Sequence, residues 1–340
     1  MKKLRVLVLM HEALIPPEEF KSAELKAAAW RTEYDILNTL KKIGHDVQSV
    51  GIGSDLGVIR KAIEDFKPHV AFNLLEEFDG QAIFDQNVVS FLELLRVPYT
   101  GCNPRGLMLA RDKALCKKIL SFHRIHTPDF VVYPIGGKIR LPKRFKYPLI
   151  VKSLIEEASL GISQASIVNS DSQLQERVLF IHQKIGTDAL AEEFIDGREI
   201  YVSVMGNSRL HVYSIWELFF KNMPENQTKI ATAKAKWDLE YQKKCGISSG
   251  PAKDLSDEKN KQIVNLSKRV FNVLGLNGYA RIDYRMKENG EIYVIEVNPN
   301  PQIAFDEDFA NAAKNSGLSY NELLQKILNL GIRWATNRSG

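Results

Sequence analysis

Residues 279–301, YARIDYRMKENGEIYVIEVNPNP, constrain the fold of this chain more than any other segment. Two runs of alternating apolar and polar residues flank Asn289-Gly290, a dipeptide that is typical of a β-hairpin turn. If these two residues form the turn, Asp283 lies directly opposite Glu296, on the same face, because strand side chains alternate. A four-residue turn keeps this pairing, whereas a three- or five-residue turn offsets it. Facing carboxylates repel each other, so the pair predicts a positive group between them.

A divalent cation in that gap would remove the repulsion. Mg²⁺ takes oxygen ligands and usually completes its shell with water and phosphate oxygens. The hairpin offers three protein oxygens on one face, from Asp283, Glu296 and the amide of Asn298. Arg281, expected opposite Asn298, adds a positive charge where an anionic transition state can develop. A solvated hairpin face with mixed charges is the ordinary alternative; the NPNP sequence and the motifs below favour the metal site.

Composition excludes several other classes of protein. The chain has 340 residues, of which 44% are hydrophobic and 26% charged, as in a soluble globular protein of two or three lobes. Its net charge of +5 is scattered without a basic block, so nucleic-acid binding is not expected. The three widely spaced cysteines favour reduced thiols and a cytoplasmic protein. The N-terminal apolar run is short and interrupted by Arg5, and no segment approaches the ~20 apolar residues of a membrane span.

The order of elements predicts an α/β lobe followed by α+β subdomains. Alternating strand-like and helix-like segments over residues 4–100 predict a small open parallel sheet with its ligand edge at the carboxyl ends of the strands. Residues 147–168 predict a hairpin flap and residues 189–220 antiparallel strands, followed by a Lys-rich polar stretch to residue 253. The expected division is 1–118, 119–190 and 191–332, with a polar tail at 333–340.

The motif ARIDYR…YVIEVNPNP resembles the C-terminal metal motif of ATP-grasp enzymes, specifically relatives of D-alanine–D-alanine ligase. The resemblance covers nearly the whole chain, through VPYTGCNPRGLMLARDKALCKKIL to NAAKNSGLSYNELLQKIL. It implies an ATP-grasp fold with an N-terminal open parallel α/β (pre-ATP-grasp) lobe. It also implies ATP and Mg²⁺, with two ions and Mn²⁺ as a substitute, small carboxylate and amine substrates, and, by analogy alone, a homodimer.

The same resemblance assigns roles to the hairpin. Asp283, Glu296 and Asn298 match the Mg²⁺ ligands, with Glu296 between two ions. Arg281 matches the arginine that contacts an acyl-phosphate intermediate. In the implied reaction ATP phosphorylates a carboxylate, and an amine then displaces phosphate to form an amide or peptide bond.

Other motifs match the nucleotide site. A single lysine is more often a solvated surface residue, but Lys152 ends an apolar run and therefore needs a buried partner. The small residues of EEASLGISQAS match a phosphate flap, whose backbone N–H groups can approach phosphate closely. Glu192 is expected to accept from the adenine amine, and Glu199 to bind the ribose. The full set of predicted nucleotide-binding residues is Lys113, Lys152, Ser159, Leu160, Gly161, Glu192, Phe194, Ile195, Glu199 and Lys236.

The chain departs from the family pattern where amino acids are recognised. The N-terminal segment MHEALIPPEEF has no glycine, and Glu12 is only a loose substitute for the glutamate that binds an amino group. The serine and tyrosine of a gating triad are replaced by Ala158 and Trp237, and Gln302 replaces an oxyanion-hole glycine.

An acidic segment follows the metal motif. Asp306, Glu307 and Asp308 would repel a carboxylate and favour an amine-bearing acceptor, or they cap a helix that begins near Phe309.

We therefore expect an ATP-dependent carboxylate–amine ligase acting on amino acids or small peptide-like molecules. The alternatives are a genuine D-alanine–D-alanine ligase of cell-wall synthesis and a non-catalytic ATP-binding regulatory protein.

Overall fold

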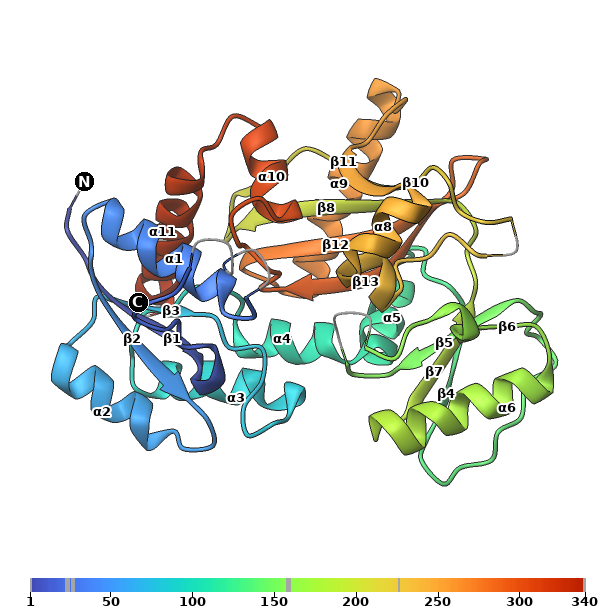
Figure 1. Cartoon of the computed structure of the whole chain (residues 1–340), viewed down its shortest axis with the longest axis horizontal. Coiled ribbons are helices and arrows are strands. Elements are labelled where there is room, and N and C mark those ends of the chain that lie inside the picture. The colour runs from blue at the N-terminus through green and yellow to red at the C-terminus, as the bar shows by residue number, and fades with distance from the viewer. Residues whose placement is uncertain (1, 22–24, 26–27, 157–159, 226, 339–340) are drawn as a thin grey trace.

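The computed structural model describes residues 2–21, 25, 28–156, 160–225 and 227–338. Three sheets organise these residues, one in each lobe of the molecule (Figure 1). A three-stranded parallel sheet has the order β2-β1-β3, a four-stranded sheet the order β4-β7-β5-β6, and the largest sheet the order β11-β10-β8-β12-β13, with β9 beside β8. Within the described residues, no helix has both the length and the apolar character needed to cross a membrane.

The first lobe confirms the predicted alternation of strands and helices. Its parallel strands pair in register from Arg5 opposite Asp46 to His11 opposite Ile52. The alternation predicted over residues 4–100 does not end in a further strand, because at residues 97–100 only Tyr99 makes an isolated bridge to Ala71. The elements are β1 (Arg5–His11), α1 (Arg31–Lys42), β2 (Asp46–Ile52), α2 (Gly57–Phe66), β3 (Val70–Asn73) and α3 (Asp85–Leu94).

Two consecutive helices lead from this lobe to the rest of the molecule. The side chain of Asn103 caps α4 (Pro104–Arg111) by accepting from Gly106 N, and Asp112 caps α5 (Lys113–Phe122) by accepting from Leu115 N. The cap at Asp112 fixes Lys113 as the first residue of α5, directed toward the centre of the molecule.

The four-stranded sheet carries the predicted hairpin of β5 and β6. The first of the antiparallel strands expected over residues 189–220 is β7. It pairs with β4 and β5, so it belongs to the four-stranded sheet and not to the sheet that contains β8. Since β7 runs through the boundary expected at residue 190, the small lobe ends after β7. Its elements are β4 (Phe130–Tyr133), β5 (Leu149–Ser153), β6 (Ile167–Val168), α6 (Asp171–Phe180), the π-helical turn η5 (Ile181–Ile185) and β7 (Ala189–Glu193).

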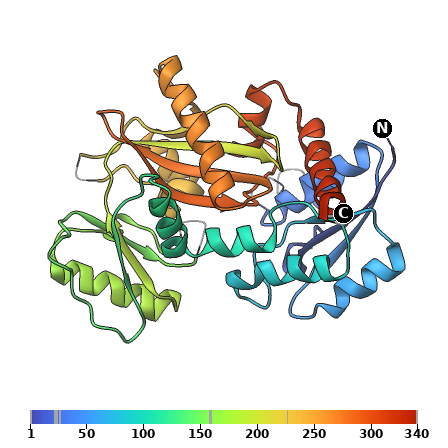
Figure 2. The same cartoon turned by 180° about the vertical axis from the view of Figure 1, so that it is seen from behind.

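The large sheet carries α9 on one face, as seen from behind in Figure 2. Tyr284 of β12 points to α9, where its hydroxyl lies 2.8 Å from Ser267 Oγ, so Asp283 faces the opposite side. The polar stretch at 221–253 is not irregular, since it contains two helices and an edge strand. The elements are β8 (Arg198–Gly206), β9 (Leu210–Val212), β10 (Trp216–Phe220), α7 (Ala233–Trp237), α8 (Leu239–Cys245), β11 (Ile247–Pro251), α9 (Asp257–Val273), β12 (Gly278–Met286) and β13 (Ile292–Pro299).

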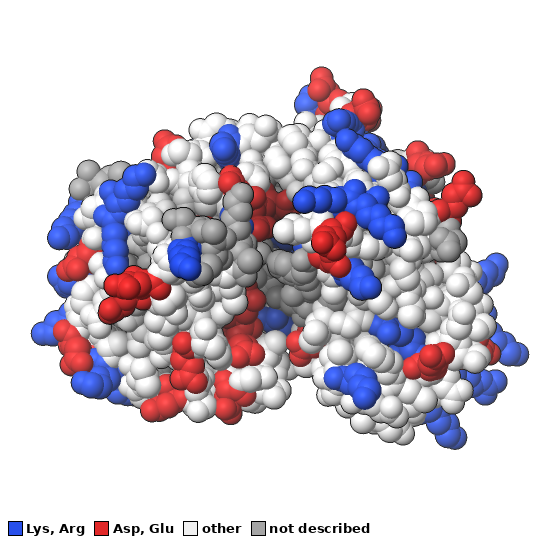
Figure 3. Space-filling view, in the orientation of Figure 1, with Lys and Arg blue, Asp and Glu red and all other residues white. Residues whose placement is uncertain are grey.

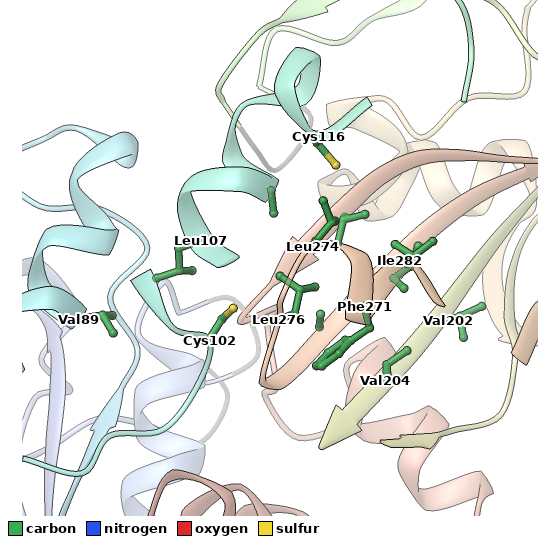
Figure 4. Close-up of a cluster of buried hydrophobic side chains, with 14 of the residues drawn as sticks. Val89, Cys102, Leu107, Cys116, Val202, Val204, Phe271, Leu274, Leu276 and Ile282 are labelled. Atoms are coloured by element: carbon green, nitrogen blue, oxygen red, sulfur yellow. The ribbon is translucent and has the colours of Figure 1, made fainter. Parts of the chain in front are cut away.

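Of the two C-terminal helices, α10 (Asp308–Asn315) lies against β8 and β11 of the large sheet, and α11 (Tyr320–Arg338) returns to the first lobe, where it contacts α1 and β3. The tail expected at residues 333–340 is therefore helical as far as Arg338. A continuous apolar core joins the first lobe to the large sheet through α4, whereas the small lobe has a cluster of its own (Figure 4). Its members include Val89, Cys102, Leu107, Val202, Val204, Phe271, Leu276 and Ile282.

Candidate active site

The hairpin of β12 and β13 brings the predicted metal ligands together. Asp283 is paired with Glu296, and Arg281 with Asn298, as the sequence predicts. The turn is not the expected two residues, because Met286 pairs with Ile292 and leaves five residues between them.

A bulge corrects the offset that this longer turn creates. Tyr284 pairs with Val294, and the next pair is Asp283 with Glu296, so Ile295 is the extra residue of β13. The bulge therefore restores the opposition of the two carboxylates.

The opposed carboxylates are held by different cations. Arg281 donates to both oxygens of Asp283, at 2.7 and 2.9 Å, and Asn298 Nδ2 donates to Asp283 Oδ2 at 3.1 Å. Glu296 Oε1 lies 3.1 Å from Lys113 Nζ. Burial raises the pKa of Asp283 above its ordinary value, against the effect of Arg281, and the charge of Glu296 raises it further.

The pKa of Glu296 moves in the other direction. Burial opposes its ionisation, but Lys113, Lys152 and Lys236 outweigh burial and lower the pKa to about 2. Within the described residues, no group of three or more His, Cys, Asp or Glu side chains is arranged to hold a metal. Two carboxylates and one amide instead fit Mg²⁺, which takes its other ligands from water and phosphate.

A cavity with an empty volume of about 820 Å³, part of it open to solvent, lies between the small sheet and the hairpin. In the view of Figure 3, the molecular surface is hollowed near its middle, and acidic side chains lie at the rim of this hollow. Of the predicted residues, those that line the cavity are Lys113, Lys152, Leu160, Glu192, Phe194, Ile195, Glu199, Lys236, Asp283 and Glu296. Ser159 lies outside the described residues.

The lysines at the cavity are buried and paired. Lys113 is 6% exposed and donates to Glu156 O at 2.5 Å. Lys152 is 4% exposed, and its Nζ lies 2.7 Å from Glu192 Oε1. Burial opposes the charge of Lys152, but Glu192 and Glu296 outweigh it and raise its pKa. The prediction that Lys152 is buried beside a partner is confirmed.

A family model described as the D-ala D-ala ligase C-terminus matches residues 121–329, more than half of the chain. The chain belongs to the D-alanine–D-alanine ligase family. Its members use ATP with Mg²⁺, and this chain is an ATP-grasp ligase that forms carbon–nitrogen bonds.

Individual relatives agree with this family. The D-alanine–D-alanine ligase of Aquifex aeolicus is 28% identical over 96% of this chain and 100% of its own length. The D-alanine–D-alanine ligase of Syntrophotalea carbinolica is 31% identical over 90% of this chain and 92% of its own. The solved structure of D-alanine–D-alanine ligase from Bacillus anthracis complexed with ATP has a TM-score of 0.77 at 21% identity, covering 98% of this chain and 99% of that chain.

In this member of the family, the acids expected at adenine and ribose already have protein partners. Glu192 is 1% exposed, with Lys152 at one oxygen and Lys117 Nζ 3.0 Å from the other. Glu199 accepts from Arg285 at 2.6 Å and from the hydroxyl of Tyr201 at 2.8 Å. Their roles toward the nucleotide stay predictions.

The backbone of the adenine segment corrects one expectation. Phe194 N donates to Pro148 O at 3.2 Å, so this N–H is not presented to a ring edge, and only the carbonyl group of Phe194 can serve there.

The acidic segment after the metal motif does not cap α10 in the expected way. Glu307 occupies the N-cap position, but its side chain makes no capping hydrogen bond. Asp308 Oδ1 instead accepts from Ser249 Oγ at 2.7 Å, and Glu307 lies 3.8 Å from Arg31 of the first lobe. Gln302 donates to Thr32 at 3.2 Å, so this loop is attached to α1.

The structure adds two charged residues that the sequence analysis missed. Arg285 lines the cavity and donates to Glu199, and its position two residues after Asp283 on one strand was a usable indication. Lys117 lies behind the cavity, four residues after Lys113 on α5, and that helical spacing places both side chains on one face.

Proposed function

We propose that this chain forms an amide or peptide bond between an amino acid or small peptide-like carboxylate and an amine, through an acyl phosphate. The observation that carries this proposal is one cavity lined together by Lys113, Lys152, Asp283 and Glu296. Two buried ammonium groups suit the phosphates of ATP, and the opposed carboxylates suit Mg²⁺.

The proposed reaction has two steps. A carboxylate oxygen of the donor attacks the γ-phosphorus of ATP, and ADP leaves. The nitrogen of the acceptor amine then attacks the acyl carbon, phosphate leaves, and the nitrogen loses a proton.

The chain contributes mainly positioning and charge. Lys113 and Lys152 would hold the phosphates, and Arg281, freed from Asp283, would stabilise the oxyanion. Bound Mg²⁺ would neutralise the charge that develops on the phosphates. Asp283, Glu296 and Asn298 would hold the Mg²⁺, for which we propose two ions, and Mn²⁺ would be an expected substitute.

D-alanine–D-alanine ligation is the second candidate, favoured by the names of full-length relatives. The acidic segment argues for a different acceptor, because its carboxylates would repel a carboxylate-bearing one. These acids interact with Arg281 of the hairpin: the charge of Asp308 raises the pKa of Arg281, and Arg281 opposes the rise in the pKa of Glu307. The three buried free cysteines support a cytoplasmic enzyme, and the homodimer stays a prediction.

The test is ADP release with matched variants. Asp283→Asn and Glu296→Gln should each abolish ADP formation in a screen of amino acids and small peptides, while the control Glu291→Gln, an exposed acid beside the same hairpin turn, should behave as wild type. Full ADP production by either site variant would refute the metal assignment. Mass spectrometry of the wild-type products identifies the substrates. A D-alanine dipeptide as the sole product would establish the second candidate, and ATP binding without ADP release across the panel would indicate a regulatory protein.

A further inference from the structure

Lys117 is the most deeply buried cation near the cavity, yet it does not line it. Its side chain is 2% exposed and lies on α5, one turn beyond Lys113. The described residues that line the cavity do not include Lys117, which instead borders a small void behind β13. Burying an ammonium group is strongly unfavourable unless it is paired, so its partners explain its presence.

The first partner is the bulge in β13. Lys117 Nζ donates to Ile295 O at 3.0 Å, and Ile295 is the residue that the bulge inserts. A bulged residue lies outside the regular ladder, so its carbonyl group needs a donor from elsewhere. Because Glu296 follows directly, the position of its carboxylate depends on a bulge that Lys117 holds.

The second partner is Glu192. Lys117 Nζ lies 3.0 Å from Glu192 Oε2, and Lys152 Nζ lies 2.7 Å from Glu192 Oε1. The carboxylate is therefore held from two sides, and one of its two cations is the lysine that faces the cavity. Without Lys117, one oxygen of a fully buried carboxylate would lose its counter-charge, and the carboxylate could rotate and carry Lys152 with it.

We propose that Lys117 is a positioning residue that does not touch the nucleotide. It holds the side chain of Lys152 in position through Glu192, and the carboxylate of Glu296 through the Ile295 bulge. This inference rests on the proposed function. Lys117 couples the two halves of the site, because its one ammonium group helps to position both Lys152 on β5, which is expected to bind nucleotide, and Glu296 on β13, which is expected to bind the metal. Lys117 would thus affect the binding of Mg²⁺ and nucleotide only through the residues that hold them.

The test compares Lys117→Met with Lys118→Met, a matched change at the next residue of α5, whose side chain is exposed. Calorimetric titration with a non-hydrolysable ATP analogue is carried out at several Mg²⁺ concentrations. Lys117→Met should weaken analogue binding and raise the half-saturating Mg²⁺ concentration, each by roughly 10- to 100-fold. Lys118→Met should match wild type. A purely structural role would lower the melting temperature and leave the Mg²⁺ dependence of the folded protein unchanged.

A second variant keeps the proposal falsifiable if Lys117→Met does not fold. Lys117→Gln keeps an amide donor for Ile295 O and should fold, yet it removes the charge that holds Glu192, the anchor of Lys152. It should therefore show the same weakened dependence on Mg²⁺ and nucleotide. Wild-type affinities in either folded variant would overturn the inference. Absence of analogue binding by the wild type would instead refute the proposed function.

Discussion

Individual carboxyl groups in this protein differ widely in their tendency to ionise. Glu296 is surrounded by lysines, and its pKa falls to about 2, although it is buried. Glu33 of α1 is 4% exposed and has no hydrogen-bond partner for Oε2 among the described residues, and burial raises its pKa from 4.5 to about 7. Burial is common to both, so the neighbouring cations decide the direction of the shift.

Glu33 predicts a dependence of stability on pH. Its folded-state pKa is raised, so the folded protein retains a proton that the unfolded chain releases between pH 4.5 and 7. Its contribution is complete below pH 4.5 and is lost as the pH rises through about 7, a change of roughly 3 kcal/mol. Glu33→Gln removes this ionisation, so its melting temperature relative to wild type should rise between pH 5 and pH 8 by a few degrees. The exposed Glu64→Gln is the control, and parallel melting curves for Glu33→Gln and wild type at both pH values would contradict the prediction.

At the scale of elements, the small lobe is fastened to the large one above the cavity. Gln164, at the start of the 3₁₀ turn η4 (Gln164–Ser166), donates to Thr228 O and accepts from Thr228 N, both at 2.9 Å. Arg285 of β12 donates to Lys229 O at 2.8 Å, so the loop that Gln164 holds is also attached to the large sheet. Of the gating positions, Ala158 and the side chain of Trp237 lie outside the described structure.

This pair of hydrogen bonds predicts the effect of Gln164→Ala. The two hydrogen bonds between the lobes contribute about 1 kcal/mol each, so their loss should weaken binding of an ATP analogue by up to about 30-fold. Gln183→Ala, at an exposed glutamine of the same lobe, should have no effect. Calorimetry measures the affinities, and equal values for the two variants would show that the hydrogen bonds between Gln164 and Thr228 do not assist nucleotide binding.

At the scale of the whole molecule, the first lobe depends on the end of the chain for its core. Val6 and Val8 of β1 share one buried cluster with Leu324 and Ile327 of α11, while Leu7, on the opposite face of β1, belongs to the core that continues to the large sheet. Strand alternation directs the two sets to opposite faces. We therefore propose that residues 1–118 form a lobe that does not unfold independently of the others.

That shared core predicts cooperative unfolding. Leu324 is fully buried, and Leu324→Ala should destabilise the protein by about 2–5 kcal/mol. Because both lobes pack on α11, scanning calorimetry should show one transition at a lower temperature. Lys326→Ala, on the exposed side of the same helix, should leave the transition in place. A separate first-lobe transition at the wild-type temperature would show that the lobes unfold independently.

The sequence alone determined the elements and the chemistry of the hairpin. Alternation along β12 and β13 is a local property, so it was enough to place Arg281 with Asp283 on one face of β12 and Glu296 with Asn298 on one face of β13. The apolar run before Lys152 was likewise enough to predict its burial.

Tertiary structure decided what depends on partners far apart in the chain. Two local departures, a five-residue turn and the Ile295 bulge, cancel each other, and the donor that satisfies the bulge comes from Lys117, 178 residues away in the chain. The sheet of β7 and the two lysines that hold Glu192 were also not readable locally, since strand pairing and buried charge pairing are set by which segments meet in space.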